Sequence, residues 1–237
     1  MHRKGRQDKV RSKVFGKLAR EITTAAKLGL PDPAFNPRLR AAILAARAEN
    51  MTKDVIERAI KKAQGGDAEN YEDMRYEGYG PGGVAVIVET LTDNRNRTVG
   101  EIRAALTRSG GSLGENGSVS WMFDQMGLIV LDVNGSDPDE LALVAIDAGA
   151  DDVSVEDGGI EIYTQPQDLH RVQEELVKGG YSVESAELTM RPKTQITPES
   201  DLAVKVIRLV EKLEDLDDVQ TVYTNLDITD DVLAAVT

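Results

Sequence analysis

The residue types that usually carry catalysis are scarce in this sequence. It contains no Cys and two His, His2 and His170, which stand far apart in the chain. Neither a thiolate nucleophile nor a transition-metal site of His and Cys ligands is therefore indicated. The acidic run DDVSVEDGG is better explained as a solvated face than as a general acid–base pair. We predict a protein that is not an enzyme, with no catalytic residue and no metal site.

The stretch YEGYGPGGVAV at residues 76–86 contains a literal G-x-G-x-x-G. A dinucleotide-binding loop follows a strand and opens a helix, whose N-terminus holds the pyrophosphate. Here the preceding residues are polar without a strand pattern, and a β-branched segment follows. Pro81 also removes a backbone N–H that a phosphate cradle would use. We predict no small-molecule cofactor, and we interpret the glycines as a hinge between two parts of the chain: Gly78, Gly80, Gly82 and Gly83.

The charge of the chain changes sign near residue 66. Residues 1–66 hold 16 Lys and Arg against 6 Asp and Glu, whereas residues 67–237 hold 12 against 35. A net charge of +10 is thus followed by one of −23, which the overall value of −13 conceals. Clustered positive charge is typical of a nucleic-acid contact, so the first third of the chain is the predicted contact.

A basic stripe supports this prediction. In QDKVRSKVFGKLAREITTAAKLG the apolar residues recur at helical spacing, and most of the basic ones fall on the opposite side. Cations along one helix face are suited to phosphate contacts. The predicted nucleic-acid-binding residues here are Arg3, Lys4, Arg6, Lys9, Lys13, Lys17, Arg20 and Lys27.

The segment TDNRNRT, residues 92–98, is a second candidate anion site. It lies between a predicted strand and a predicted helix, where helix amides and the guanidinium groups of Arg95 and Arg97 would converge on a phosphate. The alternative is that Asn96 caps the helix while both arginines pair with nearby acids. The glycine-rich GGSLGENGS at 110–118 is predicted to be a surface loop in a position to touch a partner.

The helices and strands that position these residues can be predicted from the spacing of apolar residues and from Gly, Pro and capping residues at their ends. The basic third contains three helices: the first ends at Gly29, the second is capped by Asn36 with Pro37 at its first position, and the third is capped by Thr52. The remainder alternates strands and helices. Its predicted elements are strand 84–91, helix 98–109, hairpin 118–124 and 127–133, helix 138–148, strands 153–156 and 160–164, helix 166–178, strand 183–190, helix 198–214 and strand 220–228.

These elements predict an α+β protein of three parts. The basic helical domain covers residues 1–70. A discontinuous α/β domain, 71–134 plus 193–237, has the β-α-β-β-α-β order of a ferredoxin-like fold. Residues 135–192 form a second α/β domain inserted into it. The alternative assigns strand 127–133 to the inserted domain, and the pattern does not decide between the two.

Five segments resemble the YebC/PmpR family in their order and spacing, and the resemblance covers essentially the whole chain. They are HRKGRQDKVRSKVFGKLAREIT, NPRLRAAI, MTKDVIERAIKKAQGG, RYEGYGPGGVAVIVETLTDNRNRT and GGSLGENGSVSWMFD. The resemblance implies a helical domain followed by two α/β domains. It also implies a DNA-binding transcriptional regulator without catalytic activity. Mitochondrial relatives are translational activators, and bacterial members have been tied to stalled ribosomes.

The sequence and the resemblance together predict the following setting. Family members usually carry a short stretch before H-R-K, and this sequence begins at Met1-His2-Arg3-Lys4, so its start is expected to be internal or trimmed. No apolar run reaches the roughly 18 residues of a membrane span, and no apolar leader is present, so a cytoplasmic protein without a membrane partner is expected. The predicted partner is nucleic acid, either DNA or ribosomal RNA in a ribosome, and a monomer is favoured.

Overall fold

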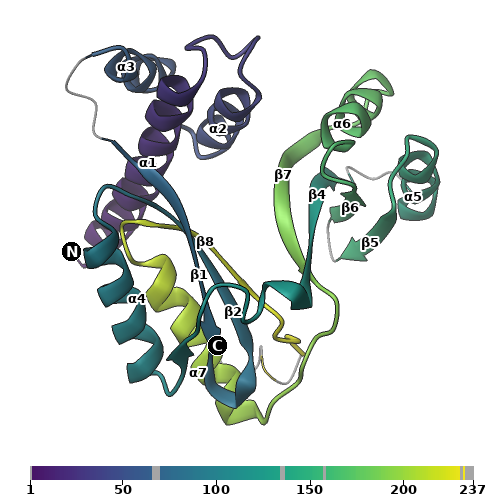
Figure 1. Ribbon diagram of the computed structural model, residues 1–237. Helices are drawn as coiled ribbons and strands as arrows, with labels where there is room; N and C mark the ends of the chain where they lie inside the picture. Colours follow the sequence, from purple (N-terminus) through teal and green to yellow (C-terminus); the bar gives the residue numbers. More distant parts are fainter. Residues whose placement is uncertain (1, 66–69, 134–136, 157–158, 230–231, 233–237) are drawn as a thin grey trace.

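The computed structural model describes residues 2–65, 70–133, 137–156, 159–229 and 232, with the main chain alone for residues 2–10 and 156. Figure 1 shows three parts. A helical unit and one sheet-containing unit rise like two arms from a base formed by the other sheet-containing unit. None of the described helices is both long and apolar enough to cross a membrane.

The helical unit contains the three predicted helices: α1 (His2–Leu28), α2 (Pro37–Ala48) and α3 (Lys53–Ala63). The Asn36 side chain accepts the Leu39 N–H at 3.0 Å, as expected of a helix cap. The core is small and rich in alanine, with fully buried Ile22 and Leu39 as its largest members. The three predicted helices and the Asn36 cap are therefore confirmed.

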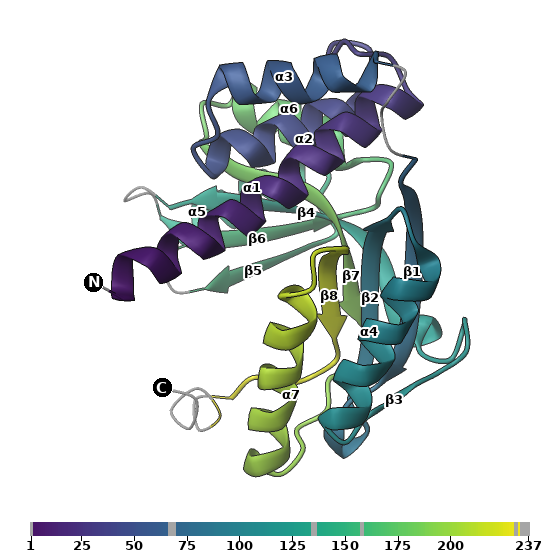
Figure 2. The ribbon, with the colours of Figure 1, turned by 90° about the vertical axis from the view of Figure 1, so that its left-hand side faces the viewer.

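The base is a four-stranded antiparallel sheet in the order β3-β1-β2-β8, with two helices on one face. Figure 2 shows α4 and α7 side by side in front of it. They close a core that includes Val86, Val88, Ile102 and Leu209. The bounds are β1 (Glu72–Tyr79), β2 (Ala85–Thr92), α4 (Arg95–Arg108), β3 (Ser112–Leu113), α7 (Ser200–Glu214) and β8 (Val219–Thr224).

The second sheet, in the order β5-β6-β4-β7, lies between β3 and α7 in the chain. Its chain order is β-α-β-β-α-β, so the ferredoxin-like order that we predicted belongs to this inserted unit. The α+β class with two sheet-containing units after the helices is confirmed. The bounds are β4 (Phe123–Asp132), α5 (Pro138–Asp147), β5 (Asp152–Glu156), β6 (Gly159–Thr164), α6 (Leu169–Lys178) and β7 (Val183–Pro192).

The predicted hairpin 118–124 and 127–133 is wrong. A short 3₁₀ turn, η2 (Ser120–Met122), leads into the single strand β4, which pairs with β6 and β7. Gly127 suggested a turn, but it lies within the strand and allows a close approach: a Cβ there would collide with the Thr164 Oγ1. Strand 127–133 therefore belongs to the inserted unit, which is the alternative that the sequence left open.

The interpretation of the residues before the glycines also needs correction. Glu72–Tyr79 is a strand, β1, which pairs antiparallel with β2 along its whole length. Gly78 lies within it, and the 3₁₀ turn η1 (Pro81–Gly83) closes the hairpin, with Gly82 at a φ of 71°. The predicted hinge glycines therefore lie in one hairpin of the base, Gly78 in its first strand and the other three in its turn, and not between two parts of the chain. The sequence pattern failed because β1, which reads EDMRYEGY, opens with two acidic residues and has no regular alternation of apolar and polar side chains.

Candidate nucleic-acid interface

Three members of the basic stripe on α1 contact the C-terminal end of α7 and the turn that follows it. Lys13 donates to the Asp215 carbonyl at 2.9 Å, and Lys17 donates to the Glu214 carbonyl at 2.5 Å. Arg20 donates to the Asp217 carbonyl at 2.7 Å. Cations favour this end of a helix because its last carbonyls lack partners within the helix. These three side chains therefore dock the helical unit onto the base.

The remaining five residues of the basic stripe make no contact with α7 that the structure describes. The main chain of Arg3, Lys4, Arg6 and Lys9 continues α1, and their side chains lie outside the described residues. Lys27, in the last turn of α1, is exposed and donates to the Asn70 Oδ1 at 2.7 Å. The structure leaves the prediction that these five residues bind nucleic acid untested.

Arg95 and Arg97 both pair with acids of the same chain. Helix α4 begins at Arg95, three residues earlier than predicted, and Asn94 caps it by accepting the Arg97 N–H at 3.1 Å. The Arg95 Nε donates to Glu72 at 2.6 Å, and Arg97 Nη2 donates to Asp93 at 2.7 Å. The structure thus matches the alternative in which an Asn caps the helix and the arginines pair internally, with Asn94 in place of Asn96.

A buried carboxylate, that of Asp218, occupies the position where we had predicted an anion. Its Oδ2 accepts from Arg97 Nη2 at 2.6 Å and from the hydroxyls of Thr98 and Thr92 at 2.8 and 3.0 Å. Arg20 also approaches it, at 3.4 Å. Burial alone would raise the Asp218 pKa, but the hydrogen bonds from Arg97, Thr98 and Thr92 hold the pKa below its usual value. Asp218 therefore ties α1, β2 and α4 together as an internal anion at neutral pH.

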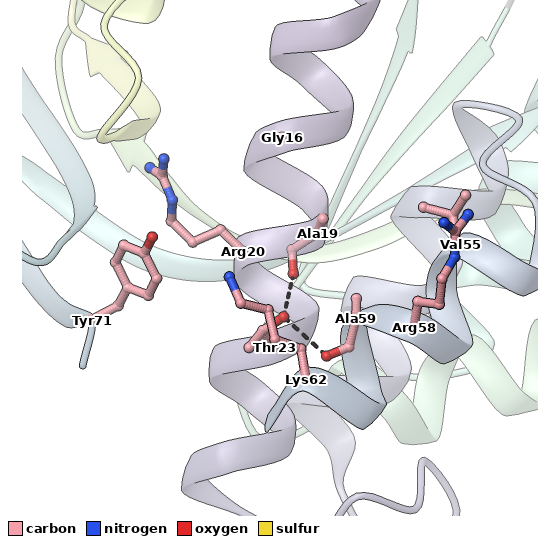
Figure 3. A pocket seen from close by; sticks show the side chains of 9 residues that line it. All are labelled: Gly16, Ala19, Arg20, Thr23, Val55, Arg58, Ala59, Lys62 and Tyr71. Carbon is pink, nitrogen blue, oxygen red and sulfur yellow. Dashed lines mark hydrogen bonds between the residues drawn. The ribbon is translucent and has the colours of Figure 1, made fainter. Parts of the chain in front are cut away.

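A groove between α1 and α3 presents two cations, Arg58 and Lys62, that are not among the predicted nucleic-acid-binding residues. Its volume is about 390 Å³, and small residues such as Gly16, Ala19 and Ala59 form much of its wall. Figure 3 shows Arg20, Tyr71 and the Lys62 ammonium at one end and Arg58 beside Val55 at the other. The Arg20 guanidinium lies 5.0 Å from the centre of the Tyr71 ring. The Thr23 hydroxyl in the wall already donates within the helices, to Ala19 or Ala59.

Arg58 and Lys62 both remain exposed at the rim of this groove. They stand four residues apart on α3, so they share one helix face. The sequence signal for these two residues is their i, i+4 spacing in KDVIERAIKKA. The prediction was based on the longer basic stripe of α1 and did not include them. A groove with small residues in its wall and cations at its rim can take a phosphodiester backbone, because the wall allows close approach and the rim neutralises charge.

Within the described part of the chain, no group of three or more His, Asp and Glu is arranged to hold a metal ion. His170 is exposed on α6 and lines a second groove, which is shared with α2. Among the described residues, the exposed cations of α3 at the groove are therefore the candidates for phosphate contacts.

Two family models match the chain. The model described as the TACO1/YebC protein N-terminal domain matches residues 1–66, and the model described as the TACO1/YebC second and third domain matches residues 71–226. A crystal structure of a conserved hypothetical protein from Aquifex aeolicus is also similar, with 47% identity and a TM-score of 0.84. That match covers 92% of this chain and 90% of the other. Models of a single family thus account for both the helical part and the two sheets.

Proposed function

This chain belongs to the TACO1/YebC family, and from that premise we propose that it is a nucleic-acid-associated regulator of gene expression. The form we put first is a DNA-binding transcriptional regulatory protein, because the family is transcription-regulator-like. The observation that carries the proposal is the cationic groove between α1 and α3, in a unit whose net charge is +10. We further propose that the protein acts in the cytoplasm and without catalysis, so ATP, NAD and NADP should leave its Tm unchanged.

The geometry narrows the set of proposed contacts. We assign phosphate contacts to Arg58 and Lys62 at the groove, and we keep the remaining predicted cations of α1 other than Arg20 as proposed contacts. Lys13 and Lys17 are assigned to docking because they reach the carbonyls at the end of α7. Arg95 and Arg97 are assigned to internal pairing. The α1 cations proposed as contacts are Arg3, Lys4, Arg6, Lys9 and Lys27.

A ribosome-associated translation factor is the second candidate, and the charge of the body favours it. Residues 67–237 carry a net charge of −23, which a DNA duplex would repel, so duplex contact would be confined to the helical unit. A ribosome offers both RNA phosphates for the groove and basic proteins for the acidic units. Co-sedimentation with ribosomes, compared with recovery of specific promoter DNA from the same lysate, separates the two candidates.

The groove is tested by the double variant Arg58→Gln/Lys62→Gln. If each residue neutralises one phosphate, the slope of log K against log salt should flatten by about 1.8 on duplex DNA and by about 1.4 on single strands. The loss should be similar for all sequences, since phosphate contacts carry no base information. Stability should change by less than about 0.5 kcal/mol, because both side chains are on the surface.

A matched control is Lys205→Gln/Arg208→Gln, which removes the same two charges from an exposed face of α7. This control should leave the salt slope unchanged. Equal slopes for both double variants would mean that the helical unit only adds long-range charge, and the groove would lose its proposed role. A protein that binds neither DNA, RNA nor ribosomes would refute the proposed function itself.

A further inference from the structure

The loop before β4 presents the single Trp of the chain to solvent. The Trp121 side chain in η2 is 64% exposed, although the neighbouring Val119 and Phe123 are buried in a core between the two sheets. This loop continues the glycine-rich stretch that we predicted to touch a partner. An exposed Trp side chain contributes little to a hydrophobic core. The hydrogen bonds around it show whether its orientation is fixed.

The main chain beneath the ring is fixed by a buried carboxylate. Glu77 on β1 is 5% exposed, and its carboxylate accepts the backbone N–H groups of Gly117, Val119 and Ser120 at 2.9, 2.8 and 2.8 Å. Burial alone would raise the Glu77 pKa, but these amides hold the pKa below its usual value. The carboxylate therefore remains charged and clamps the loop at neutral pH.

The ring itself is also oriented. The Trp121 Nε1–H donates to the Ser118 carbonyl at 3.1 Å, and the Tyr79 hydroxyl donates to the same carbonyl at 3.0 Å. Tyr79 and Glu77 both lie on β1, so the loop and the ring are both held by hydrogen bonds to one strand. A ring that is held before binding loses little conformational entropy when a partner stacks on it.

We propose that Trp121 is a stacking platform for an unpaired base of a single-stranded nucleic acid. The core of a protein interface is more apolar than the rest of the surface, whereas the loop that precedes this ring in the chain is polar and contains Glu115, Asn116 and Ser118. A base needs one exposed π-face, which every nucleotide can use. Lys193 fixes the far side of the loop: its backbone N–H donates to the Met122 carbonyl at 2.9 Å, and its half-exposed ammonium pairs with Asp124 at 3.3 Å.

This inference rests on the proposed function and restricts its partner to nucleic acid with unpaired bases. Because Trp121 is the single Trp, tryptophan emission excited at a wavelength that the six Tyr do not absorb reports on this site alone. Single-stranded RNA of about a dozen nucleotides should quench it saturably. An abasic oligomer of equal length, an RNA duplex and inorganic polyphosphate should compete for the cations but leave the emission nearly unchanged.

Affinity is then measured by anisotropy of a labelled single strand. Trp121→Leu should weaken binding roughly 5- to 150-fold, as found for aromatic residues that stack on one base, while Trp121→Phe should retain most of it. The salt slope should be the same in both variants, since neither removes a cation. Both variants should keep the parental Tm because the side chain is exposed.

The two proposals fail in different ways. Unchanged affinity in Trp121→Leu, together with unquenched emission in a saturated complex, would overturn the stacking proposal while leaving the groove and the proposed function intact. A protein contact would then be the better explanation for the held ring. Loss of affinity without quenching would also overturn it, since stacking requires both.

Discussion

The cations of the helical unit and those at the start of α4 are placed in different surroundings. Arg58 and Lys62 stand exposed at the rim of a groove. Arg97, in contrast, lies 2.6 Å from the buried carboxylate of Asp218, and Arg95 pairs with Glu72. These two cations of α3 are exposed at the surface, whereas these two arginines of α4 hold neighbouring segments together.

This difference shows what a basic motif near a helix N-terminus does when an acid of the same chain is within reach. Helix amides and guanidinium groups attract any anion. A tethered carboxylate is present at a high effective concentration, whereas a phosphate must come from solution and displace it. Asp218 is also buried and held by three partners, so exchange would cost those hydrogen bonds. The basic motif at the start of α4 is therefore structural, whereas Arg58 and Lys62 are exposed on the surface of α3.

The largest effect should follow removal of the internal anion. Asp218→Asn should lower the free energy of unfolding by about 2–3 kcal/mol, because it weakens charge-assisted hydrogen bonds and leaves Arg97 without its buried partner. Urea titration followed by circular dichroism measures this. Asp215→Asn is the matched control, since its side chain is 74% exposed and it should cost less than about 1 kcal/mol. Equal losses in both variants would show that Asp218 is not the structural centre of this end of the base.

The pH dependence of stability should identify the same carboxyl. The Asp218 pKa is lowered in the folded protein, so its contribution is complete above the unfolded value near 4 and is lost as pH falls through the folded pKa. The gap in unfolding free energy between the parent and Asp218→Asn should be constant from pH 7 to about 5 and should narrow below about pH 4. A gap that stays constant down to pH 2 would contradict the charged role. Glu77→Gln should show the same sign, because its pKa is also lowered.

A smaller effect should separate docking cations from binding cations. Lys13→Gln/Lys17→Gln removes the contacts of α1 with the end of α7 and should cost about 1 kcal/mol of stability. Its salt slope for nucleic-acid binding should change by less than about half a unit, opposite to the groove variant. Chemical denaturation and salt titrations of the two double variants together test this. A slope that flattens by about two units would mean that α1 leaves α7 when nucleic acid binds.

Helical features with local causes could be predicted from the sequence. The Asn36–Pro37 start and the glycine after α1 fixed the helices of the basic unit, and Pro138 fixed the start of α5. The strand β1 could not be found because Glu77 points its charge to backbone amides of a loop some 40 residues later in the chain, where a polar pattern usually means solvent.

The candidate site was predictable as charge but not as geometry. Helical spacing placed Lys13 and Lys17 on one face, and the unit they belong to is the basic one. Which face meets α7 depends on a contact between residues about 200 positions apart, and no local pattern contains it. The pairing of Asp218 with Arg97 could likewise not be predicted, because the two residues are far apart in the chain and the role of Asp218 comes from its burial in the fold.

The smallest effect is expected from Arg95→Gln, which tests directly whether the cations at the start of α4 are paired internally and do not contact phosphate. Arg97 cannot be changed without disturbing Asp218, so Arg95 is the cleaner probe. Its side chain is 64% exposed and its partner Glu72 is 52% exposed, so Arg95→Gln should alter stability by less than about 0.5 kcal/mol. Its salt slope for nucleic acid should match the parent within error, because its charge is paired and phosphates bind at the groove. A slope reduced by about 0.9 on duplex DNA would show that the start of α4 does contact a phosphate, and the distinction between the two regions would then fail.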